Sequence, residues 1–187
     1  APPVLEVLSN PTFAASTPST VNVVKGKNYE ELTRRLLLSL GGMKKFVHSG
    51  DKVVIKPNIG WDRTPEQGAN THPLVVKTLV KMALEAGASK VQVFDRSCNE
   101  ERRCYFNSGI KEAVESLGDK RATIPYVEER KFVPITIKQG KALRDWIFYK
   151  EALEADCYIN VPVAKHHSLA KLTLGLKNSM GMLGGNR

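Results

Sequence analysis

The sequence predicts one α/β domain with a mainly parallel sheet, helices on both faces and a short antiparallel addition. Strand-like and helix-like apolar patterns alternate along the chain, and its 187 residues are typical of a single domain. A composition of 42% hydrophobic and 25% charged residues indicates an ordinary globular protein without a membrane span. Residues 1–19, rich in Pro, Ser and Thr, are expected to form an extended arm, and residues 20–187 the domain.

The first half of the chain carries the clearest alternation. Short β-branched or continuous apolar runs predict strands at 20–24, 52–55 and 91–94. Apolar residues at helical spacing, each series closed by glycine, predict three helices, which begin near Asn28, Pro73 and Ile110. Such alternating units form parallel sheets, because the helices cross over the faces between strands.

In the second half of the chain the alternation of strand-like and helix-like patterns stops. Two strands are expected at 123–127 and 132–137, with a further short strand at 146–149, as an edge hairpin or an antiparallel addition. A last strand is expected at 158–161. From Ser168, apolar residues at helical spacing predict a final helix: Leu169, Leu172, Leu176, Met180 and Leu183. On that helix Lys171, Gly175 and Asn178 would share one face, and the polar ending after Leu183 predicts a domain cut short.

Unusually polar loops follow three of these strands, at 56–72, 95–103 and 162–168. The carboxyl ends of parallel strands share one edge of a sheet, so the three loops should converge there. Lysine, arginine and helix N-termini favour a carboxylate or phosphate, which predicts a site for a small anion or cofactor. The predicted binding residues are Lys56, Asn58, Arg63, Arg96, Ser168, Lys177 and Asn178. The alternative is that the loop charges pair with one another on a solvated rim.

Two neighbouring residues of the third loop are the candidate catalytic groups. His166 can serve as a general base, since imidazole titrates near neutral pH, and Lys165 lies beside it. A redox-associated enzyme is one form of this hypothesis, although the sequence itself specifies neither a reaction nor a cofactor. A second hypothesis is a metal-dependent enzyme, with ligands drawn from His72, His166, His167, Asp62 and Asp95. His72 also precedes Pro73, so its structural role would be to cap a helix.

Cysteine and glycine patterns exclude several familiar sites. The three cysteines include no Cys-x-x-Cys pair, so cysteine alone cannot assemble a structural zinc or iron–sulfur centre. Cys98 and Cys104 could form a disulfide in an oxidising compartment, and Cys157 is expected in a buried strand. Glycine-rich phosphate loops and a nucleophile elbow are absent, which disfavours dinucleotide enzymes, P-loop NTPases and α/β-hydrolases.

The excess of 28 basic over 19 acidic residues gives a net charge of +9. A third hypothesis is therefore a non-enzymatic protein that binds a polyanion or an anionic surface. Nucleic acid is a disfavoured partner, because the basic residues are spread and aromatic residues for base stacking are sparse. The start at Ala1 fits either a mature exported protein or an expressed fragment.

Five sequence blocks resemble the "domain of unknown function" family 362. In chain order they are Lys56-Pro-Asn-Ile, Thr71-His-Pro, Glu85-Ala-Gly-Ala to Phe94-Asp95, Ile159-Asn-Val-Pro-Val-Ala-Lys-His-His, and Leu176-Lys-Asn-Ser-Met-Gly. The likeness extends from about Val21 onward. The positions that match the family pattern are Lys56, Asn58, Lys165, His166, Lys177 and Asn178.

The resemblance implies location more than chemistry. Most proteins of this family are uncharacterised, so it assigns no catalytic roles. Some relatives carry ferredoxin-like iron–sulfur modules, but the cysteine pattern of those modules is missing here. Others, which this sequence resembles more, carry a twin-arginine export signal, and this implies a periplasmic or otherwise exported protein. The family domain also continues beyond Arg187, in agreement with the expected truncation.

Overall fold

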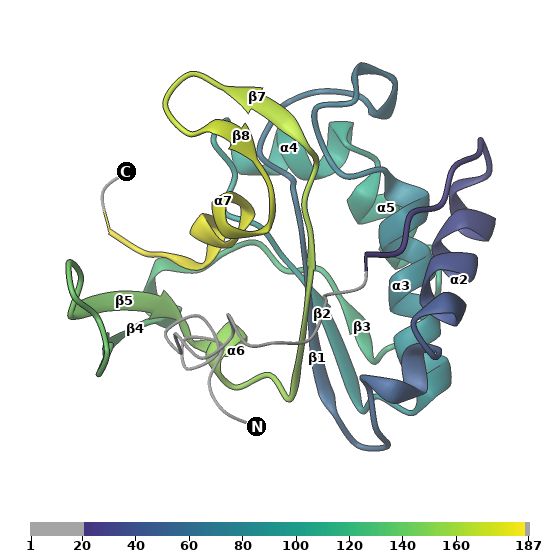
Figure 1. Ribbon diagram of the computed structural model, residues 1–187, viewed down its shortest axis with the longest axis horizontal. Helices are drawn as coiled ribbons and strands as arrows, with labels where there is room; N and C mark the ends of the chain where they lie inside the picture. The colour runs from purple at the N-terminus through teal and green to yellow at the C-terminus, as the bar shows by residue number, and fades with distance from the viewer. Residues whose placement is uncertain (1–20, 186–187) are drawn as a thin grey trace.

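A computed structural model describes residues 21–185, and its centre is a parallel four-stranded sheet (Figure 1). The strand order is β3-β2-β1-β6, so β6 returns from late in the chain to pair with β1. In this register Val54 lies between Gln92 and Tyr158. The strands are β1 (Lys52–Pro57), β2 (Lys90–Val93), β3 (Ala122–Thr123) and β6 (Cys157–Val161). The predicted α/β architecture with a mainly parallel sheet is confirmed.

Helices cover one face of the sheet. They are α2 (Tyr29–Ser39), α3 (Pro73–Ala86) and α5 (Ile110–Glu115). Alternate residues of the strands, such as Val53 and Ile55, point to this face and pack with the helices in the main core. His72 caps α3 as expected, because its Nδ1 accepts a hydrogen bond of 3.2 Å from the backbone N–H of Leu74.

The opposite face carries a smaller second layer. Val54 and Phe94 pack there against Tyr149, Ala152 and Met182. An antiparallel hairpin and short helices build this layer: β4 (Phe132–Thr136), β5 (Asp145–Tyr149), α6 (Lys150–Leu153) and α7 (Gly175–Ser179). The predicted helices on both faces of the sheet and the predicted antiparallel addition are therefore both present.

The remaining described helices are short. They are α4 (Glu101–Asn107), η2 (Met43–Lys45), η3 (Pro65–Gln67), η4 (Glu129–Lys131) and η5 (Met180–Met182). Within residues 21–185, no helix combines the length and the apolar character that a membrane crossing requires.

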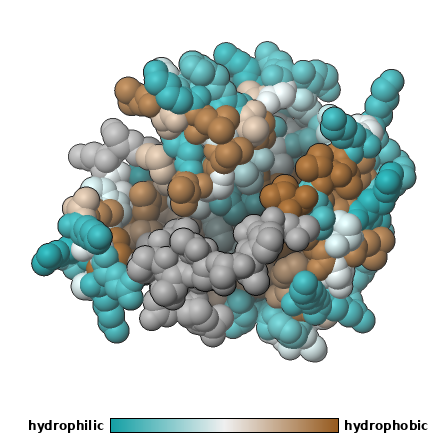
Figure 2. All heavy atoms as spheres, viewed as in Figure 1, coloured by the Kyte–Doolittle hydropathy of each residue, from teal (hydrophilic) through white to brown (hydrophobic). Residues whose placement is uncertain are grey.

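The predicted helix from Ser168 to Leu183 is wrong in its first part. An antiparallel hairpin, β7 (Lys165–His167) and β8 (Lys171–Thr173), occupies that part, and helical structure begins only at Gly175 with α7 and continues through η5 to Met182. The Thr173 hydroxyl fixes the hairpin, since it donates to the carbonyl of Val163 and accepts from the N–H of Lys165. Leu169, Leu172 and Leu176 of the predicted helix are exposed, and Figure 2 shows apolar atoms at the surface over β7, β8 and α7.

Two smaller predictions also need correction. Residues 21–24 form no strand, whereas residue 20 and the expected arm at 1–19 lie outside the described residues. The strand predicted at 123–127 shrinks to the two residues of β3, which pair parallel to β2 at the sheet edge and take no part in the antiparallel addition. A segment of two residues forms few interstrand hydrogen bonds, and it is a strand only because it pairs with β2.

Candidate functional site

A buried ion pair lies where β1 and β2 end. Lys56 is 0% exposed, and its Nζ lies 2.7 Å from Oδ1 of Asp95, whose side chain is 5% exposed. Alternation along β1 places Lys56 on the same face as Val54, beneath the second layer, where water cannot solvate an ammonium group. Asp95 supplies the opposite charge that such burial requires.

Asn178 connects this ion pair to α7. Its Nδ2 donates to the backbone carbonyl of Lys56 at 2.9 Å and to Oδ1 of Asn160 at 2.7 Å. Its Oδ1 accepts from Nζ of Lys56 at 3.3 Å. Asn160 is the register partner of Lys56 on β6, and it donates in turn to the carbonyl of Gly175. A network of buried amides therefore fixes α7 to the ends of β1 and β6.

The first two polar loops meet, as the topology predicted. Oδ2 of Asp95 accepts from the N–H of Ile59 at 2.7 Å, and the Ser97 hydroxyl donates to the carbonyl of Ile59 at 2.6 Å. Tyr105, fully buried on α4, donates its hydroxyl to the carbonyl of Asp95 and accepts from the N–H of the same residue. Burial raises the pKa of Tyr105 well above its ordinary value, so its hydroxyl stays protonated.

The third loop brings Lys165 to this edge. Its Nζ donates to Oδ1 of Asn58 at 2.8 Å and to the carbonyl of Ala69 at 2.6 Å, and it lies 5.8 Å from the ring centroid of Trp61. Burial lowers the pKa of Lys165, an effect that neighbouring Cys98 and Asp95 oppose and that the positive charge of Lys177 reinforces. Within the described chain, Lys165 has no carboxylate partner in an ion pair.

Three other predicted ligand residues lie in different surroundings. Arg63 is exposed and donates to the backbone carbonyl of Asp62. Arg96 holds the end of the described chain, since its Nη1 donates to the carbonyls of Leu183 and Gly185. Ser168 is exposed at the turn between β7 and β8. The structure therefore gathers Lys56, Asn58, Lys165, Lys177 and Asn178, and gives Arg63, Arg96 and Ser168 other contacts or an exposed position.

The histidines do not converge. His166 is exposed and pairs with Leu172 across the hairpin, on the face of β7 opposite to Lys165. Adjacent strand residues point apart, so the two candidate catalytic side chains are not brought together. Nδ1 of His167 accepts from two N–H groups of the hairpin turn, and His72 stacks on Tyr29 with ring centroids 3.8 Å apart. Between residues 21 and 185, no three His, Cys, Asp or Glu side chains are grouped to hold a metal ion.

The structure assigns no disulfide to Cys98, Cys104 or Cys157. Cys104 is buried and Cys98 is exposed, and burial raises the pKa of the Cys104 thiol. Cys157 lies in β6 as predicted, although it is half-buried because β6 is the last strand of the sheet.

Sequence reasoning missed three polar contributors. Asn160 is a site residue whose signal was an amide inside an apolar strand, since a buried polar group needs a partner. Thr71 joins two loops, because its Oγ1 accepts from the N–H of Asn58 at 2.8 Å and donates to the carbonyl of Val161 at 2.7 Å. The ring of Trp61 lies against the ammonium group of Lys165. The role of Thr71 depends on contacts with residues distant in sequence, so the block Thr71-His-Pro alone could not indicate it.

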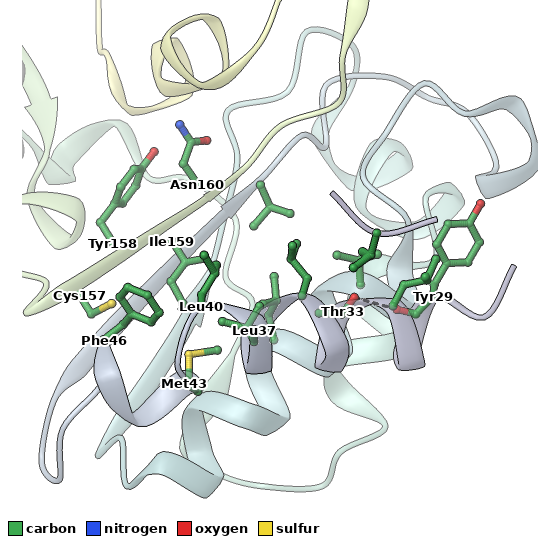
Figure 3. Close-up of a pocket in the computed structure, with 16 residues that line it drawn as sticks. Tyr29, Thr33, Leu37, Leu40, Met43, Phe46, Cys157, Tyr158, Ile159 and Asn160 are labelled. Atoms are coloured by element: carbon green, nitrogen blue, oxygen red, sulfur yellow. Dashed lines mark hydrogen bonds between the residues drawn. The ribbon is translucent and has the colours of Figure 1, made fainter. Parts of the chain in front are cut away.

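A separate apolar cavity of about 510 Å³ lies between α2 and β6 (Figure 3). Leucines of α2 form one wall, and Cys157, Ile159 and Val161 of β6 form the other. In Figure 3 the side chain of Asn160 points away from α2, toward the ion-pair side of the sheet. The cavity and the polar site therefore lie on opposite faces of β6.

Comparison with protein families identifies the chain. A model of a domain of unknown function (DUF362) matches residues 53–187, from β1 through the end of the described structure. The chain belongs to the DUF362 family. The matched region includes every residue of the ion pair and of the amide network around it.

A relative of the chain comes from Synechocystis sp.. The chain is 30% identical over 171 residues to thylakoid-associated protein sll1697 of Synechocystis sp.. The aligned region covers 89% of this chain and 51% of the relative. The chain thus spans about half the length of that relative. No solved structure matches the chain.

Proposed function

We propose that this DUF362 protein binds a small anion, bearing a carboxylate or phosphate, at the carboxyl edge of its parallel sheet. The observation that carries the proposal is Lys165, a half-buried ammonium with two neutral acceptors and, in the described chain, no carboxylate partner. A cation withdrawn from water gains most from an anion that reaches it, because the surrounding medium screens the attraction poorly.

The charges around Lys165 favour an external anion. Asp95 is a carboxylate whose charge acts on Lys165, but it already neutralises Lys56 at 2.7 Å. Lys177 adds a second positive charge near Lys165. Asn58 accepts from Lys165 through Oδ1, which leaves its amide nitrogen as a neighbouring donor for the same ligand. The ring of Trp61 adds a cation–π contact, with its centroid 5.8 Å from the ammonium nitrogen.

Isothermal titration calorimetry with inorganic phosphate and with malonate tests the proposal. Lys165→Met keeps the length and apolar stem of the side chain and removes the charge, so we expect at least about a tenfold loss of affinity. Lys81→Met, an exposed lysine on α3, is the matched control and should bind as the parent does.

Native mass spectrometry of protein purified from its host extends the test to unknown ligands. A retained anionic molecule that Lys165→Met releases would support the proposal, and its identity would show whether it is a substrate or a redox cofactor. Absence of a retained anion, together with no binding of phosphate or malonate, would refute it.

We also propose that the protein works at a membrane or outside the cytoplasm. The name of the Synechocystis relative, thylakoid-associated protein, supports the membrane-associated form of this proposal. Fractionation of host cells into cytoplasm, membrane and exported fractions, with immunodetection, provides the test. Recovery of the protein in the cytoplasmic fraction alone would contradict it.

A further inference from the structure

The β7–β8 hairpin and α7 expose an unusual amount of aliphatic surface. Leu169 at the turn is 87% exposed and Leu176 at the start of α7 is 74% exposed. With Leu172, Leu174 and Met180 they form what we call the leucine surface. A soluble protein scatters exposed apolar residues singly, so five large ones within twelve residues indicate a site of interaction.

These side chains are arranged to act together. Leu172 and Leu174 are two residues apart in extended chain and therefore share a face. Leu176 and Met180 are four residues apart across α7 and the turn that follows it, which places them on one side of the helix. The opposite side of α7 is occupied, because Asn178 is buried there against β1 and β6. Figure 2 shows the resulting apolar atoms over β7, β8 and α7.

The charged side chains in the segment that carries the leucine surface have one sign. Residues 157–187 contain no Asp or Glu. Lys171 is exposed beside the hairpin turn, His166 is exposed beside Leu172, and Lys177 flanks Leu176 on α7. Aliphatic side chains flanked by lysine and histidine, in a segment without acids, are complementary to a surface that is apolar within and anionic outside.

We propose that the leucine surface docks this protein on an anionic lipid bilayer. The leucines would enter the boundary between headgroups and acyl chains, and Lys171 and Lys177 would remain among the anionic headgroups. Figure 1 shows the hairpin projecting beyond the sheet edge, so its turn would be able to enter the headgroup region of a bilayer. The inference does not depend on the anion site at Lys165.

Vesicle sedimentation tests the inference. We expect the protein to pellet with vesicles of equal parts phosphatidylglycerol and phosphatidylcholine, and to bind phosphatidylcholine alone much less. The double variant Leu169→Glu/Leu172→Glu should lose at least about tenfold in partitioning, because it removes two aliphatic anchors and adds two negative charges. Leu38→Glu, at a 69% exposed position on α2, is the matched control and should pellet as the parent does.

Two further variants test the electrostatic contribution to vesicle binding and its independence from the anion site. Lys171→Glu should weaken binding and reduce its salt dependence, whereas Lys165→Met should leave vesicle binding unchanged. Circular dichroism confirms that each variant is folded. Failure of the parent to pellet, or equal losses in the Leu38 and hairpin variants, would overturn the inference. So would light scattering that shows a dimer of the parent and a monomer of the hairpin variant, because the surface would then bind a second copy.

Discussion

Lys56 shows at the residue scale how one buried charge organises a loop region. Its ammonium is enclosed by Asp95, the carbonyl of Pro57 and Oδ1 of Asn178. Asp95 is fixed in turn through Ile59 and Tyr105, so the geometry of the pair leaves little freedom. A sequence pattern identified Lys56 as a ligand for an external anion, whereas the folded chain supplies its counter-ion.

Loss of the Asp95 charge should be severe. In Asp95→Asn the ammonium of Lys56 stays buried without its counter-charge, so we expect the free energy of unfolding to fall by about 3–5 kcal/mol. Glu154→Gln disrupts the exposed pair of Lys150 and Glu154 on α6 and should cost under about 1 kcal/mol. Urea denaturation measures both, and equal effects in the two variants would contradict a buried role for the pair.

Lys165 makes ligand binding sensitive to alkaline pH. Its pKa in the folded protein lies below the ordinary value of 10.5, so the ammonium form is lost at a lower pH than for an exposed lysine. Binding of malonate, whose charge is constant above neutral pH, should weaken as pH rises, with a midpoint below 10.5. Calorimetric titrations at several pH values test this. The same midpoint in Lys165→Met would assign the effect to another group.

The lowered pKa of Lys165 also determines how the free energy of unfolding changes with pH. Between the lowered pKa of Lys165 and 10.5, the unfolded chain holds more protons than the folded chain. Stability contributed by this group therefore rises with pH through that window, opposite to the trend in ligand affinity. A fall of both quantities together above neutral pH would point to general unfolding as the cause.

At the element scale, α7 and the following turn close the site. Asn178 and Asn160 attach α7 to the strand ends, and Gly181 follows close against the ion pair. A Cβ added at Gly181 would overlap Oδ1 of Asp95 and Cε of Lys56. The helix is only five residues long, so these tertiary contacts define its position and its intrinsic propensity does not.

Gly181→Ala should therefore destabilise the protein. Overpacking against a buried ion pair costs about 1–3 kcal/mol, because neither charged group can move without losing its partner. Gly175→Ala is a suitable control, since its added Cβ would meet only Nδ2 of Asn160, at 3.3 Å. Thermal unfolding of both variants measures the difference. A Gly181 variant as stable as the control would mean that the ion pair tolerates displacement.

Thr71 connects three elements through one hydroxyl. It bonds the loop after β1 and the end of β6, just before α3 begins. Thr71→Val leaves a buried N–H and a carbonyl without this partner, and we expect a loss of about 1–3 kcal/mol. Thr78→Val removes a hydroxyl that only donates back to the carbonyl of Leu74 within α3, so it should cost less. Denaturant midpoints compare the two, and a larger loss at Thr78 would contradict the connecting role.

At the scale of the whole molecule, the sheet order explains why distant loops meet. β6 pairs with β1 although about a hundred residues separate them, and this pairing brings the loop that follows Val161 to the loop that follows Pro57. The net charge of +9 is not concentrated at this edge, because Lys56 is neutralised and Arg96 binds backbone carbonyls. The candidate anion site therefore depends mainly on Lys165 and Lys177.

The sequence alone determined the α/β class, the positions of β1, β2, β6, α3 and α5, and the convergence of three polar loops. Those features follow from local periodicity and from the shared edge of parallel strands, which the chain expresses residue by residue. Only the tertiary structure decided that residues 165–173 form a hairpin, because leucines at helical spacing form a helix only when a partner covers them. It also decided the pairing of Lys56 with Asp95 and the seclusion of Lys165, since burial and counter-charges depend on contacts between segments far apart in the chain.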